Sequence, residues 1–150
     1  MPDSKTLTSF LTSRNVWHRL IEFNEPVITV EQASRQVNAE KIVKSIVMID
    51  SNGKPILALV PAERMVSHKK LKKLLDVKDV RLANREEVLD LSGYPAGGVP
   101  PFNEVKRVLA DPAILKNQTI VVGGGDIDKL LEIRTTDAID ISNAQVVDIT

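Results

Sequence analysis

The sequence contains no cysteine and only two histidines, His18 and His68. Without cysteine the chain can form no disulfide, no thiolate zinc site and no cysteine nucleophile. Neither histidine belongs to a short spacing typical of zinc-binding motifs, and such residues more often serve as surface or partly buried side chains than as ligands. No Gly-x-Ser-x-Gly sequence is present, although a Ser-His-Asp arrangement stays geometrically open. We therefore expect neither a metal nor a cofactor.

Long apolar runs and excess charge of one sign are also missing. No apolar stretch approaches the roughly 20 residues needed to cross a bilayer, and the beginning of the chain, Met1-Pro2-Asp3-Ser4-Lys5, shows no pattern of a signal peptide. We expect a soluble, cytoplasmic protein without a membrane partner. Twenty basic residues balance twenty acidic ones, which argues against a general nucleic-acid coat protein and against DNA binding but leaves room for a local basic patch.

Aromatic residues make up only 3% of the 150 residues, whereas hydrophobic residues in total make up 43%. The core must therefore consist mainly of Ile, Leu and Val. The length suits one domain, residues 1–150, with a genuine core and little room for a second.

Short helical and strand-like segments alternate along the chain. The Asn52-Gly53 pair is the strongest short-range signal, because Asn-Gly favours the two-residue turn of a β-hairpin. The patterns predict helices over 6–16, 30–37, 67–75, 85–91 and 135–139, and strands over 17–23, 44–50, 55–60, 80–83, 105–110, 119–122, 130–134 and 144–149. Hairpins and short loops dominate, so we predict an α+β fold, a single mixed domain around a curved, mostly antiparallel sheet.

The stretch from Leu91 to Phe102 interrupts this alternation with three glycines and three prolines. Proline fixes φ and removes an amide donor, and glycine permits close approach to the backbone. A stiff, exposed loop of this kind more often lines a site than merely connects elements.

Two further features allow both a functional and a structural interpretation. Gly123-Gly124-Gly125 lacks the Gly-x-x-x-x-Gly-Lys and Gly-x-Gly-x-x-Gly patterns of phosphate sites, so it is either a tight turn or a place where a substrate approaches bare backbone. Lys44 begins a predicted strand and either extends into solvent or orients an anion or carbonyl oxygen.

The predicted helix over 67–75 carries four lysines on one side. This face is either simply solvated or contacts RNA phosphates, in which case binding depends on salt. The lysines concerned are Lys69, Lys70, Lys72 and Lys73.

Four segments in this order resemble the YbaK/ProX family of aminoacyl-tRNA deacylases, which is also the editing (insertion) domain of bacterial-type prolyl-tRNA synthetases. The segments are Ile42-Val43-Lys44-Ser45-Ile46-Val47, the Asn52-Gly53 hairpin, 92–102 and Val121-Val122-Gly123-Gly124-Gly125. The resemblance covers the chain roughly from Trp17 to its end. It implies the same α+β fold and hydrolysis of the ester of a mischarged tRNA, without a metal.

The resemblance also implies roles for individual residues. Lys44 matches the family's pocket lysine, and Gly97 and Pro101 match the ends of its Gly-x-x-x-Pro loop; with Gly98 they form the predicted catalytic set. The predicted substrate-binding residues are Gly93, Tyr94, Val99, Pro100, Phe102, Gly123, Gly124, Gly125 and His68. The lysines of the 67–75 helix are the predicted RNA contacts.

One segment departs from the family pattern. Where the family usually has Ser-Pro-Phe-Gly, this chain has Pro100-Pro101-Phe102-Asn103, and Asn103 can adopt the positive φ of a glycine. The expected function is a trans-editing hydrolase acting on a small amino acid, such as alanine or cysteine, on tRNA-Pro, with prolyl-tRNA synthetase as a possible partner. The alternative is a non-catalytic module that binds tRNA or a small ligand and associates with a synthetase.

Overall fold

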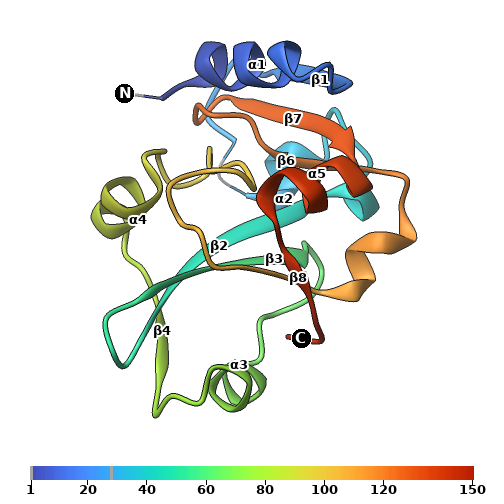
Figure 1. Ribbon diagram of the computed structural model, residues 1–150. Helices are drawn as coiled ribbons and strands as arrows, with labels where there is room; N and C mark the ends of the chain where they lie inside the picture. Colours follow the sequence, from blue (N-terminus) through green and yellow to red (C-terminus); the bar gives the residue numbers. More distant parts are fainter. Residues whose placement is uncertain (1, 28) are drawn as a thin grey trace.

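The computed structural model describes residues 2–27 and 29–150, so Met1 and Ile28 of the predicted domain lie outside the described residues. Its strands form a three-stranded sheet in the order β1-β7-β6 and a five-stranded sheet in the order β4-β2-β3-β5-β8 (Figure 1). The strands are β1 (His18–Glu22), β2 (Val43–Asp50), β3 (Pro55–Pro61), β4 (Val80–Leu82), β5 (Val108–Ala110), β6 (Thr119–Gly123), β7 (Lys129–Arg134) and β8 (Gln145–Val146).

The helices begin where the sequence supplies capping side chains. Asp3 accepts a hydrogen bond from Thr6 N at the start of α1, and both Thr29 and Asn84 form complete capping boxes at the starts of α2 and α4. The α-helices are α1 (Ser4–Ser13), α2 (Val30–Ala33), α3 (His68–Leu75), α4 (Arg85–Ser92) and α5 (Thr135–Ser142), and the short 3-10 helices are η1 (Ala39–Lys41) and η2 (Pro112–Lys116).

Three apolar clusters hold the layers together. The largest lies between the two sheets and includes Leu7 of α1, Val47 and Leu59 of the large sheet, and Leu131 of the small one. A second cluster joins α3, through Leu71, to the opposite face of the large sheet. A third joins α2 to the opposite face of the small sheet. As a result α3 lies at the far end of the molecule from α1 (Figure 1).

The predicted α+β class with mostly antiparallel strands is confirmed, and the Asn52-Gly53 hairpin joins β2 and β3 in antiparallel register. The structure adds two features. The strands divide between two sheets, and β5 pairs in parallel with both β3 and β8. These parallel pairs join segments far apart in the chain, and no local turn signal could indicate them.

Several helices and strands were predicted to extend further than they do. The strand predicted over 105–110 begins at Val108, because Val105 N binds the side chain of Asn103 and the chain is still in a turn there. The first helix ends at Ser13, before Asn15 takes a left-handed backbone conformation.

Glu132 of β7 is a mostly buried carboxylate at the centre of a hydrogen-bond network. It accepts hydrogen bonds from Arg19 at 3.0 and 3.1 Å, from Thr119 at 2.7 Å and from Lys41 at 3.3 Å. Burial by itself raises the pKa of Glu132, but these hydrogen bonds outweigh it and hold that pKa below its ordinary value of 4.5. This network ties β1, β6 and η1 to β7.

Replacing Glu132 with glutamine is expected to lower the free energy of unfolding at pH 7 by about 1–3 kcal/mol, because two cations lose their buried anionic partner. Because the folded-state pKa is lowered, the stabilisation from the carboxylate is present above the unfolded-state pKa and is lost as the pH falls below about 4.5. Urea unfolding at several pH values should show the difference between wild type and Glu132→Gln shrinking in acid.

The matched control for this variant is Glu25→Gln, since Glu25 pairs with Arg35 while both side chains are largely exposed. A change of no more than about 1 kcal/mol is expected there. A difference between wild type and Glu132→Gln that stays constant down to pH 3 would contradict the assignment.

Candidate functional site

The glycine-proline loop between α4 and β5 rests directly on the turn between β6 and β7. Gly125 N donates to Gly98 O at 2.8 Å. A Cβ placed on Gly123 would lie 2.3 Å from Val99 O, and one on Gly98 would lie 2.9 Å from the carbonyl carbon of Asp126. Both glycines are therefore required because two backbones are in contact, which gives the 123–125 segment a packing reason independent of any substrate.

A cavity of about 240 Å³ opens beside this contact. Its lining comes from α2, residues 42–46 at the start of β2, the loop residues Gly97 and Val99, and β6 with Gly123. The structure thus brings together Lys44, Gly97, Val99 and Gly123, which are widely separated in the sequence. Its volume lies below the range of about 300–1,000 Å³ usual for drug-sized ligands.

The Lys44 ammonium is held by a backbone group. Its Nζ donates to Arg64 O at 3.0 Å, and an ammonium has three donors, so two remain available. The guanidinium of Arg64 in turn donates to Thr150 Oγ1 at 3.3 Å and lies 3.8 Å from the buried Asp111 carboxylate. The segment that holds Lys44 is therefore itself fixed to the end of the described chain.

Two loop residues that line this cavity have backbone donors without a partner in the described part of the chain. Among the described residues, neither Gly97 N nor Val99 N makes a hydrogen bond, and both residues line the cavity. Gly98 differs, since its N–H donates to Pro95 O at 2.9 Å and the residue does not line the cavity. The lining of the cavity thus includes one lysine and two residues whose amide donors are unused.

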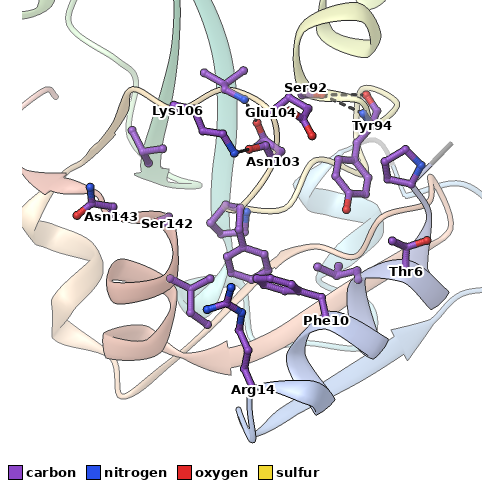
Figure 2. A pocket seen from close by; sticks show the side chains of 17 residues that line it. Thr6, Phe10, Arg14, Ser92, Tyr94, Asn103, Glu104, Lys106, Ser142 and Asn143 are labelled. Atoms are coloured by element: carbon purple, nitrogen blue, oxygen red, sulfur yellow. Dashed lines mark hydrogen bonds between the residues drawn. The ribbon is translucent and has the colours of Figure 1, made fainter.

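The two ends of the loop line a different, larger cavity of about 490 Å³, shown in Figure 2. Tyr94, Pro101 and Phe102 contribute to its lining. The Phe10 and Phe102 rings lie 6.0 Å apart, and the Arg14 guanidinium lies 4.5 Å above the Phe10 ring. Burial is the main cause that raises the pKa of Tyr94. Pro101, predicted to be catalytic, and Tyr94 and Phe102, predicted to bind substrate, therefore do not line the cavity of Lys44.

Asn103 keeps the turn in a way the sequence did not suggest. Asn103 does not use the positive φ open to asparagine, since it is not among the described residues with positive φ. Its side chain stabilises the turn instead: Nδ2 donates to Pro100 O at 2.8 Å, and Oδ1 accepts from Val105 N at 2.7 Å. A side-chain turn of this kind is a common use of asparagine.

The remaining predicted site residues lie elsewhere. Gly93 is the C-cap of α4, with a φ of 85°. Pro100 is a buried residue of the loop and lines neither of the two cavities. His68 and the four lysines belong to α3, which packs on the far face of the large sheet, and Lys70 donates to Asp148 at 2.8 Å. Their predicted roles stay predictions.

Sequence reasoning missed the contribution of α2 to the cavity, through Thr29, Val30 and Ala33. It also did not assign a role to Ser45, which lines the cavity beside Lys44. The one feature of the sequence that could have drawn attention to Ser45 is its position next to Lys44. Nothing in the sequence places α2 there, because its approach depends on the packing of Ala33 against Ile42 and Val121.

The model of the aminoacyl-tRNA editing domain matches residues 24–141. The chain is 38% identical over 105 residues to the proline–tRNA ligase of Thermosipho africanus, a match that covers 68% of this chain and 18% of the ligase. It is 36% identical over 95 residues to the ligase of Lactobacillus delbrueckii subsp. bulgaricus, covering 62% and 17%. This chain therefore belongs to the aminoacyl-tRNA editing domain family, and the match spans less than a fifth of the length of these ligases.

Solved structures agree on the fold. A protein provisionally described as a trans-editing enzyme for prolyl-tRNA synthetase superposes with a TM-score of 0.86 at 24% identity, covering 100% of this chain and 98% of that one. A hypothetical protein superposes with a TM-score of 0.83 at 28% identity, covering 95% and 97%. Within residues 2–27 and 29–150, no helix is long and apolar enough to span a membrane, and no His, Asp and Glu side chains cluster as a metal site would require.

Replacing Gly123 with alanine is expected to displace the loop, because the new Cβ would overlap Val99 O. Overpacking of this kind costs about 1–3 kcal/mol of unfolding free energy and should move the Gly97 and Val99 amides, which thermal unfolding and amide NMR shifts of the loop would report. Gly53→Ala is the control for the loop shifts: nothing lies within 4 Å of a Cβ there, so its φ of +78° lowers stability while the loop shifts stay at wild type. A Gly123→Ala protein with wild-type loop shifts would show that the backbone contact is not needed.

Proposed function

We propose that this chain is an aminoacyl-tRNA deacylase that hydrolyses the ester of a mischarged tRNA, with a small amino acid such as alanine or cysteine on tRNA-Pro as its substrate. The observation that supports this most is that Lys44 lines one small cavity together with Gly97 and Val99, whose amides have no partner among the described residues. The family membership of the chain supports the same reaction class. A cytoplasmic location, where aminoacyl-tRNA is made and used, and the residues 1–150 acting as one domain, are part of the proposal.

The chemistry needs few protein groups. An aminoacyl ester is already activated, so the protein must position it and stabilise the oxyanion that forms when water attacks the carbonyl carbon. Backbone N–H groups on a proline-stiffened loop supply that stabilisation without reorganising. The new bond joins the water oxygen to the carbonyl carbon, the ester C–O bond breaks, and the ribose oxygen leaves with a proton.

Lys44 complements the amides. In the proposal its free donors orient the ester carbonyl, and the terminal ribose hydroxyl of the tRNA helps to activate the water. The cavity is small and mostly apolar, which suits a short side chain. A second hydrolytic site is useful for such amino acids, because a synthetase pocket discriminates by only about 1–3 kcal/mol per methylene.

The deciding experiment is a deacylation panel. The protein is incubated with tRNA-Pro charged with alanine, cysteine, serine or proline, and release of each amino acid is followed. Release of alanine or cysteine with proline retained is the expected result. Tight binding of the charged tRNAs without any release would instead favour the non-catalytic binding module, and binding to prolyl-tRNA synthetase can be measured on the same preparation.

Lys44→Ala is expected to lower kcat by about 100-fold or more, the usual loss when one donor to an oxyanion is removed. Single-turnover deacylation with saturating enzyme measures this. Lys54→Ala is the matched control, because Lys54 is exposed in the β2–β3 hairpin. Full activity in Lys44→Ala, with the fold intact by circular dichroism, would remove Lys44 from the mechanism.

The lysines of α3 are proposed as contacts for the tRNA backbone, with His68 beside them. Lys69 and Lys73 are exposed, whereas Lys70 is engaged by Asp148. Replacing Lys69 and Lys73 together with alanine should weaken tRNA binding and lower the slope of log Kd against log salt by about 1 to 2. Fluorescence anisotropy at several salt concentrations tests this, and an unchanged slope would leave the face merely solvated.

A further inference from the structure

The Ser45 hydroxyl is the one buried side-chain polar atom that lacks a hydrogen-bond partner among the described residues. Other buried serines are satisfied. Ser92 Oγ donates to Val88 O at 2.6 Å and accepts from Tyr94 N at 3.1 Å, and Ser142 Oγ donates to Ala138 O at 2.6 Å. Because an unsatisfied buried hydroxyl destabilises a fold, its presence calls for an explanation outside the folded chain itself.

The position of Ser45 suggests that explanation. It lines the cavity of about 240 Å³, and because side chains alternate along β2 it lies on the face of Val43 and Val47, toward the small sheet, opposite to the face of Lys44. The other hydroxyl of that lining, Thr29 Oγ1, already accepts from Gln32 N in the capping box of α2. Ser45 is therefore the lining hydroxyl that is still able to bind a ligand.

The charged groups of the lining indicate which group of a bound ligand would pair with Ser45 Oγ. The described residues of the lining include one cation, Lys44, and no carboxylate. An aminoacyl ester presents an acceptor, the ester carbonyl, and a donor, the α-amino group. The Lys44 ammonium and the unused amides of Gly97 and Val99 are donors and suit the carbonyl. A donor such as the α-amino group needs an acceptor, and the Ser45 oxygen has both lone pairs free.

We propose that Ser45 Oγ accepts a hydrogen bond from the α-amino group of the bound aminoacyl moiety and thereby selects for an aminoacyl over a simple acyl group. This inference rests on the proposed function. Oγ has almost no surface open to solvent although Ser45 is partly exposed as a residue, so in the proposal Oγ reaches the ligand by a change of χ1 rotamer. Ser45 acts as a substrate-binding residue and Lys44 remains the donor to the carbonyl.

The first test separates a ligand-binding role from a structural one by the sign of a stability change. Ser45→Ala removes an unsatisfied group, so its melting temperature should equal or exceed that of wild type. Ser92→Ala is the matched control, because it removes a satisfied buried hydroxyl and should lower the melting temperature by a few degrees. A melting temperature of Ser45→Ala clearly below wild type would overturn the proposal.

The second test measures binding without hydrolysis. The probes are two stable adenosine derivatives, one carrying alanine and one carrying propionate through a 3′-amide, so that they differ in the α-amino group alone. Calorimetry should show that Ser45→Ala loses about 10- to 100-fold in affinity for the alanyl derivative, the range for a hydrogen bond to a charged group, and almost nothing for the propionyl derivative. Ser45→Thr, which keeps the hydroxyl, should retain the preference for the alanyl derivative.

The outcomes also distinguish this inference from the proposed function. Equal losses for both derivatives in Ser45→Ala, or a wild-type protein that does not prefer the alanyl derivative, would overturn the role of Ser45. A wild-type protein that prefers the alanyl derivative through Ser45 but releases no amino acid from charged tRNA would leave the binding role intact and refute the hydrolase.

Discussion

The candidate site depends on one contact between two backbones, that of the glycine-proline loop with the turn between β6 and β7. Gly98, Val99, Gly123 and Gly125 meet there without intervening side chains, and the Gly125 N–H to Gly98 O hydrogen bond joins them. Because the turn belongs to the small sheet, the loop takes its position from a rigid element. A loop that is stiff by its own prolines and fixed by this contact keeps its amides in place before any ligand arrives.

Unused hydrogen-bonding groups collect around the same cavity. Gly97 N, Val99 N and Ser45 Oγ have no partners among the described residues, whereas no other buried side-chain polar atom of the described residues lacks one, as the network around Glu132 illustrates. Unmet polar groups cost stability, and proteins concentrate such costs at functional sites. Among the described side chains, this separates the small cavity from the larger one shown in Figure 2, whose Asn103 and Ser92 side chains bind nearby backbone groups.

The Lys44 side chain is held by a series of contacts that reaches the last residues of the chain. Its ammonium is held by the Arg64 carbonyl, and Arg64 reaches toward Asp111 and Thr150. Asp111 is buried and accepts hydrogen bonds from Ala113 N and Ile149 N, so it joins η2 to the segment after β8. The parallel pairing of β5 with β3 and β8 brings these segments together, and the orientation of Lys44 follows from it.

The sequence alone was enough for the features that depend on neighbouring residues: the Asn52-Gly53 hairpin, the α+β class, and the family to which the chain belongs. It also indicated Lys44 and the loop, because their residue types are unusual for their positions. Only the tertiary structure decided that Gly97 and Val99 share a cavity with Lys44 while Tyr94 and Phe102 line another, that α2 closes that cavity, and that Ser45 lacks a partner. The physical reason is that close approach of backbones and the satisfaction of hydrogen bonds depend on groups far apart in the chain, and no local pattern encodes them.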